Sequence, residues 1–182
     1  MVTEQQVPSK AALLEALRSS EREVLARLRS LPEPELEQGR YENGWSARQI
    51  LAHVASIEWS YPRLIDIAKQ APPDAANATP AEARQTGRQE SSRTRTGTVR
   101  GGIDDYNQRQ VEKRADASVD ELLAEFQKNR AATIAAVEEV DEALLSTPIQ
   151  SAGGISGALA SVIDAIAVRH ILVHVNDIVG GD

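Results

Sequence analysis

The sequence predicts an all-α protein, a four-helix bundle with a long crossover connection after the second helix. Ala, Leu, Glu and Arg dominate the composition, and these residues are strong helix formers. Four segments repeat apolar residues at the three- and four-residue spacing of an amphipathic helix. Between the second and third segments, residues 71–102 interrupt this periodicity with Pro, Gly, Ser and Thr. Four amphipathic helices of about 20 residues each are enough to enclose a core.

The first two long helices follow from apolar stripes with recognisable ends. The first is predicted over about residues 9–31, and Pro32 ends it because proline cannot continue a helix. The second begins at Ser46, where Ser46 and Gln49 have the spacing of a capping box. Pro62 lies inside this second pattern and predicts a kink, since it removes one backbone hydrogen bond.

The last two long helices have equally clear limits. A short helix is predicted over residues 104–114, and the third long helix begins at Ser118, which has a capping-box partner in Glu121. The fourth is predicted to begin near Ser156 and to end before Gly180, a residue type common just after a helix.

The connection over residues 71–102 is unusually long for a compact domain. It is locally basic through five arginines: Arg84, Arg88, Arg93, Arg95 and Arg100. We consider two interpretations, a solvated crossover loop and a lid or anion-binding segment over a nearby site. A crossover of this length would allow the second and third helices to run parallel. Residues 1–182 are expected to form one domain.

Composition excludes several classes of function. The formal net charge of −7 and the pI of about 5.1 disfavour nucleic-acid binding, because the protein as a whole would repel a phosphate backbone. The absence of cysteine excludes disulfides, thiolate metal sites and cysteine nucleophiles. No signal-peptide pattern is visible at the start and no apolar run is long enough to span a membrane. We therefore expect a cytoplasmic protein without a membrane partner.

The chain contains three histidines, and all of them lie on or beside apolar stripes. His170 and His174 are one helical turn apart on the fourth helix, so their rings can converge on one ion. His53 lies at the edge of the stripe of the second helix. We expect all three imidazoles to point into the bundle, where unpartnered rings would be costly and a divalent metal would satisfy one nitrogen of each.

Three neutral nitrogens suit Zn²⁺, Ni²⁺, Fe²⁺ or Cu²⁺ better than Mg²⁺ or Ca²⁺. Three ligands also leave coordination positions open, as in catalytic sites. Asp177 could orient His174 or bind the metal, or it could pair with an arginine. Glu58 is expected on the flank of the bundle. Asn129 and Thr133 either line a pocket or hydrogen-bond each other and the backbone.

Two segments carry the resemblance to a known family. GWSARQILAHVASIEW, residues 44–59, resembles the second-helix signature of the DinB-like superfamily, and VRHILVHVNDI, residues 168–178, resembles its last-helix HxxxH motif. Residues 104–137 resemble the third-helix region of the subgroup that contains mycothiol-dependent maleylpyruvate isomerase, and the ClbS/DfsB-like branch is similar too.

The resemblance implies a DinB-like bundle with a divalent metal, Zn or Ni in the first place and Fe in the second, held by His53, His170 and His174. The mycothiol isomerase has Glu at the position of His170, so the similarity is to the three-His form. Relatives with an assigned activity use the metal to activate a low-molecular-weight thiol, and dimers are common. We therefore expect a homodimer that acts on a small molecule.

The leading hypothesis is a metal-dependent thiol transferase or isomerase, with the arginines of residues 84–100 as a candidate clamp for an anionic cosubstrate. Two alternatives remain open. The same site could hydrolyse a substrate with metal-activated water, or the protein could be a non-catalytic stress-response protein that binds a small molecule or metal. Catalytic residues beyond the metal ligands are unknown from the sequence. A purely structural bundle would keep its histidines hydrogen-bonded and bind no metal.

Overall fold

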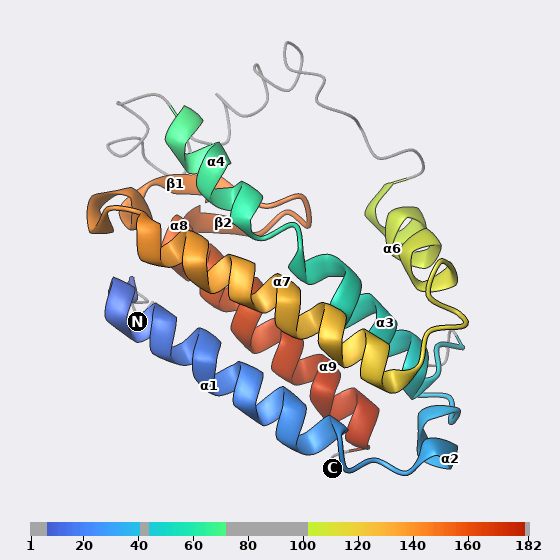
Figure 1. Cartoon of the computed structure of the whole chain (residues 1–182). Helices are drawn as coiled ribbons and strands as arrows, with labels where there is room; N and C mark the ends of the chain where they lie inside the picture. Colours follow the sequence, from blue (N-terminus) through green and yellow to red (C-terminus); the bar gives the residue numbers. More distant parts are fainter. Residues whose placement is uncertain (1–6, 41–43, 72–101, 181–182) are drawn as a thin grey trace, which may run out of the picture.

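Four long helical segments pack side by side in the computed structural model, which describes residues 7–40, 44–71 and 102–180 (Figure 1). The fourth segment is one continuous helix in three parts, because a π-helical stretch separates two α-helical ones. In chain order the segments are α1 (Lys10–Leu28), α3 (Ala47–Glu58) with α4 (Pro62–Gln70), α7 (Val119–Glu139), and α8 (Leu159–Ile163) with the π segment η3 (Asp164–Arg169) and α9 (His170–Val179).

Shorter elements connect and flank the bundle. The helix α6 packs against α3, and a small hairpin fills the connection between α7 and α8. In that hairpin β1 pairs antiparallel with β2, and Pro148 lies opposite Ala158. The bounds are α2 Glu33–Leu36, α6 Gly102–Glu112, η2 Glu142–Ser146, β1 Pro148–Gln150 and β2 Ser156–Ala158. The predicted fold class, an all-α four-helix bundle, is confirmed.

The helices are not joined in a simple up-and-down order. In Figure 1, α3 and α7 run in one direction, whereas α1 and α9 run in the other. The contacts between long helices pair α7 with α1 and α3, and α9 with α1 and α3. The second and third long helices are therefore parallel neighbours, as the long connection between them allowed. That connection, with the arginines of residues 84–100, lies outside the described residues.

Local sequence signals set the helix ends. Both predicted capping boxes form: the Ser46 and Ser118 hydroxyls accept the backbone N–H groups of Gln49 and Glu121, and those two side chains accept the cap N–H groups in return. At the other end of the chain, Gly180 has a left-handed backbone with φ of 69°, which allows the chain to leave α9 after Val179.

Three predicted boundaries are wrong. The first helix ends at Leu28, one turn before the prolines. Pro62 does not kink a continuous helix but begins a new one, since a turn separates α3 from α4 and proline is well suited to the first helical position. Residues 156–158 form the second hairpin strand, and the helix begins only at Leu159.

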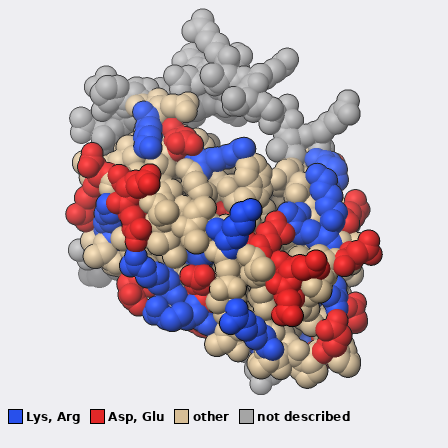
Figure 2. Space-filling model, in the orientation of Figure 1, with Lys and Arg blue, Asp and Glu red and all other residues tan. Residues whose placement is uncertain are grey.

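The core lies along the whole bundle axis in two clusters. One surrounds the hairpin end and the other surrounds α3, which buries nine of its residues (Ala47, Ile50, Leu51, Ala52, His53, Val54, Ala55, Ser56 and Glu58). On the face shown in Figure 2, basic and acidic side chains alternate over the surface instead of gathering by sign. Among the described residues, each helix is too short or too polar to span a lipid bilayer.

Candidate metal centre

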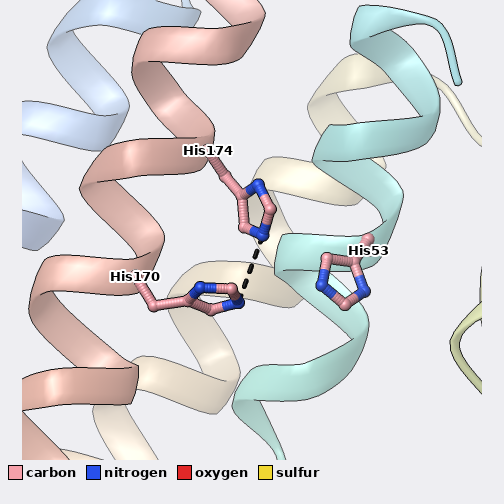
Figure 3. Close-up of side chains that lie close together, drawn as sticks. All are labelled: His53, His170 and His174. Carbon is pink, nitrogen blue, oxygen red and sulfur yellow. Dashed lines mark hydrogen bonds between the residues drawn. The ribbon is translucent and has the colours of Figure 1, made fainter. Parts of the chain in front are cut away.

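The three histidines meet between α3 and α9 (Figure 3). His170 and His174 occupy successive turns at the start of α9, so their rings project from the same face. His53 projects from the middle of α3 towards them. One ligand atom from each ring lies within 4.8 Å of the others, and the described residues hold no other such group of three potential ligands. The predicted convergence of the three rings is therefore present.

The distances between the rings suit a single transition-metal ion. The Nε2 atoms of His170 and His174 are 3.1 Å apart. With Zn–N distances of about 2.0–2.1 Å, two nitrogens of one tetrahedral ion are separated by roughly 3.3 Å. The centroid of the His53 ring lies 5.2 Å from that of His174 and 6.3 Å from that of His170, and the His53 ring plane is nearly perpendicular to both of theirs. One ligand atom of each ring lies within 4.8 Å of the others, which makes the three histidines a group that could hold one metal ion.

The electrostatic environment keeps the imidazoles neutral. Burial, followed by the proximity of His174 and His170, lowers the pKa of His53 to about 3. Burial also lowers the pKa of His170 and that of His174, although Asp177 opposes the change in both. A neutral imidazole carries a lone pair on one nitrogen and is the form that binds metals. The donor set therefore suits a divalent transition metal.

Asp177 determines which nitrogen of His174 is available. Its Oδ2 atom lies 3.3 Å from Nδ1 of His174, one turn further along α9. An ionised carboxylate only accepts hydrogen bonds, so Nδ1 of His174 carries the proton and Nε2 presents a lone pair to the cluster. Of the roles considered for Asp177, the structure supports orientation of His174, an arrangement common around metal-binding histidines.

The indole ring of Trp45 contacts His53 and is itself hydrogen-bonded to α6. The ring of Trp45, just before α3, lies 5.4 Å from the His53 ring, and its Nε1 donates to Gln108 on α6 at 2.9 Å. The Nδ1 atom of His53 is buried without a hydrogen-bond partner in the described part of the chain. The contact of Gln108 with Trp45 could not be predicted from the sequence, because it depends on how α6 packs against α3.

His170 differs from the other two histidines in its exposure. The side chain of His174 is 12% exposed and His53 is buried, but His170 is exposed to solvent. The prediction that all three rings point into the bundle interior is therefore wrong for His170. As a result the cluster lies at the edge of the bundle and one side of it is open to molecules in solution.

The predicted position of Glu58 is also wrong. It is fully buried, not on the flank of the bundle, and forms an ion pair with the equally buried Arg130. Arg130 lies on the apolar stripe of α7 between Phe126 and Thr133, and this position is the one signal in the sequence for its burial. The polar pair near it makes backbone contacts: Asn129 donates to the Ala55 carbonyl and the Thr133 hydroxyl donates to the Asn129 carbonyl.

The fold and the cluster together define a class: four-helix-bundle proteins with a candidate divalent-metal site between the second and the last long helix. Comparison with protein families gives the same answer. The family model described as the DinB superfamily matches residues 16–177. The chain therefore belongs to the DinB superfamily, and the resemblance seen in its second and last helices is confirmed.

A solved structure shares the fold. YfiT from Bacillus subtilis, described as a probable metal-dependent hydrolase with an unusual four-helix bundle topology, aligns with a TM-score of 0.56 and 14% sequence identity. The alignment covers 99% of this chain and 87% of that protein. No curated protein matches the sequence.

Proposed function

We propose that the protein is a metal-dependent enzyme that joins a low-molecular-weight thiol to a small-molecule substrate. The observation that carries the proposal is the set of three neutral imidazoles, contributed by two helices and open to solvent at His170. His53, His170 and His174 would hold a divalent metal, Zn or Ni in the first place and Fe in the second. Such an ion lowers the pKa of a thiol or water that it coordinates.

The neighbourhood of the cluster favours a thiol over water as the nucleophile. Within the described residues no carboxylate joins the cluster, and Asp177 is engaged with Nδ1 of His174. Activation of water usually benefits from a general base, whereas a thiol is already far more acidic than water, with a pKa of about 8.5 against 15.7. Since the chain has no cysteine, the thiol must come from a second substrate.

A metal-dependent hydrolase is the second candidate. It is supported by the shared fold of YfiT, which is described as a probable metal-dependent hydrolase. The same three histidines would serve both reactions. A non-catalytic protein that binds a metal or small molecule would also use them, but would show no turnover.

The first experiment measures metal content. Protein purified without a histidine tag is analysed by elemental mass spectrometry, together with His53→Ala and His170→Ala. Val173→Ala is the matched control, because Val173 is 55% exposed and lies on α9 between the two histidines. We expect about one transition-metal ion per chain in the wild type and the control, and none in the histidine variants. A wild type that takes up neither Zn²⁺ nor Ni²⁺ would refute the proposal.

The second experiment separates the two reactions. Metal-loaded protein is incubated with an electrophile and a panel of thiols (mycothiol, bacillithiol and glutathione), and in parallel with simple esters and amides. Thiol conjugation that is lost in His170→Ala would support the transferase. Ester or amide cleavage without any thiol requirement would favour the hydrolase, and metal binding without either reaction would favour a binding protein.

Oligomeric state and location remain predictions of the sequence. We propose a homodimer in the cytoplasm. Sedimentation equilibrium tests the first point, and cell fractionation with an antibody against the protein tests the second.

A further inference from the structure

Arg130 is a fully buried arginine at the centre of the bundle. Its guanidinium stacks above the Phe126 ring, with Cζ 5.1 Å from the ring centroid. It makes five hydrogen bonds, as many as its N–H groups allow: Nε to Glu58 Oε1 at 2.7 Å, Nη2 to Glu58 Oε2 at 3.1 Å, Nη1 to the Leu17 carbonyl at 3.0 Å, Nη1 to Ser20 Oγ at 2.8 Å, and Nη2 to the Ala167 carbonyl at 2.5 Å. One side chain of α7 thus bonds to the other three long segments of the bundle.

The contact at Ala167 falls in the π-helical segment that precedes α9. There the backbone N–H of His170 donates to the Ala165 carbonyl, five residues back, instead of to that of Ile166. The Ile166 carbonyl accepts from the Tyr61 hydroxyl at 3.1 Å. Two buried side chains therefore donate hydrogen bonds to consecutive carbonyls of the π-helical segment, just before the first histidine of the cluster. Tyr61 bonds to the first of these carbonyls and Arg130 to the second.

The same guanidinium also fixes the other helix of the cluster. Glu58 lies on α3, five residues after His53, and both of its carboxylate oxygens accept from Arg130. Ala167 lies three residues before His170. Arg130 thus connects, through short and directional bonds, the helix that carries His53 to the helix that carries His170 and His174.

We propose that the Arg130–Glu58 pair is a positioning device for the candidate metal centre. It sets the shift and rotation of α9 relative to α3, and thereby the distances among the three imidazole nitrogens. This inference rests on the proposed function, since it concerns the same site. Arg130 and Glu58 are positioning residues here, because the metal would contact neither of them.

The chemistry of buried ion pairs argues for a specific role. Replacing such a pair by apolar residues of similar size is often neutral or stabilising, so stability alone does not require it. A metal site does require precision, because its ligands must be held to within about half an ångström. Outer residues that orient metal ligands typically change metal affinity by about 10–100-fold when they are replaced. The geometry here predicts an effect of that size.

The test replaces both charges at once. In Glu58→Leu/Arg130→Met no charge is left unpaired, and we expect a folded protein. Leu145→Ala is the control for general loss of core packing, because Leu145 is buried in η2 at the hairpin end and lies outside the helices that carry the histidines. Zn²⁺ affinity is measured by competition with a chelator, and the visible absorption spectrum of Co²⁺-loaded protein reports the ligand geometry.

We expect the double variant to bind Zn²⁺ about 10–100-fold more weakly than the wild type and to show an altered Co²⁺ spectrum, while Leu145→Ala retains both properties. Affinity within twofold of the wild type and an unchanged spectrum would overturn the inference while leaving the proposed function standing. A wild type that binds no metal would overturn both. Should the double variant fail to fold, Arg130→Lys, which keeps the charge but not the planar fork, is judged by the same criteria.

Discussion

The cost of keeping a histidine in the core can be measured directly. His53 is only 5% exposed, its Nδ1 atom has no hydrogen-bond partner among the described residues, and burial lowers its pKa to about 3. We predict that His53→Leu makes the metal-free protein more stable, although it removes a candidate metal ligand. Leucine is close to histidine in size and brings no polar atom into the core.

The expected gain follows from the unpaired nitrogen. A buried polar group without a partner costs about 1–3 kcal/mol. For a chain of this length each kcal/mol corresponds to a change of roughly 2–4 °C in Tm, so the middle of that range corresponds to a rise of about 6 °C. Zn²⁺ should narrow or reverse the difference, because at a hundredfold excess over Kd it stabilises only the wild type, by about 2.7 kcal/mol.

The assay is chemical denaturation in the presence of EDTA and again with Zn²⁺. Val173→Leu serves as the control, because Val173 is exposed on α9 and this substitution should change the stability without metal by no more than about 0.5 kcal/mol. A His53→Leu protein that is less stable than the wild type in EDTA would show that the ring is well accommodated without metal. That result would refute the reasoning.

Three further predictions test other parts of the structure. Asp177→Ala should weaken Zn²⁺ binding about 10–100-fold in a chelator competition, because the carboxylate orients His174. The free energy of unfolding should change little, since a negative charge near the C-terminal end of α9 is unfavourable for the helix dipole. Unaltered Zn²⁺ affinity would contradict this role. Burial raises the pKa of Tyr61 well above that of the unfolded chain, so its stabilising contribution is complete below the unfolded pKa of about 10 and is lost as the pH rises above it. Between pH 9 and pH 11 the wild type should therefore lose more stability than Tyr61→Phe in urea titrations, and equal losses would contradict the prediction. Ser46→Ala removes the capping box at the start of α3 and should therefore lower the free energy of unfolding by about 1 kcal/mol, which corresponds to a fall in Tm of roughly 2–4 °C. An unchanged Tm would show that the cap does not stabilise the protein.

Features set by nearby residues could be predicted from the sequence. The capping boxes at Ser46 and Ser118 and the helix end at Gly180 depend on contacts within a few residues, and all three form. The pairing of His170 with His174 follows from helical spacing alone. That His53 joins them depends both on its place at the edge of the apolar stripe of its helix and on the packing of α3 against α9.

Features set by packing between helices could not be predicted in this way. The sequence of the π-helical segment is apolar from Ala165 to Val168 without a break, so the periodicity of the fourth helix gives no sign of the π turn. Arg130 and Glu58 have the residue types of a solvated surface, and only their partner across the bundle allows them to be buried. The exposure of His170 depends on how far α9 is covered by its neighbours.

The pairing of the long helices affects the order in which the chain can fold. The extensive contacts of α1 and α3 are with α7 and α9, not with each other, so the first half of the chain has little core of its own. A bundle whose consecutive helices pair can begin folding as a local hairpin, but here productive contacts join residues far apart in sequence, which slows folding. During synthesis His53 emerges more than a hundred residues before His170. A growing chain therefore cannot assemble the three-histidine site until its last helix has left the ribosome.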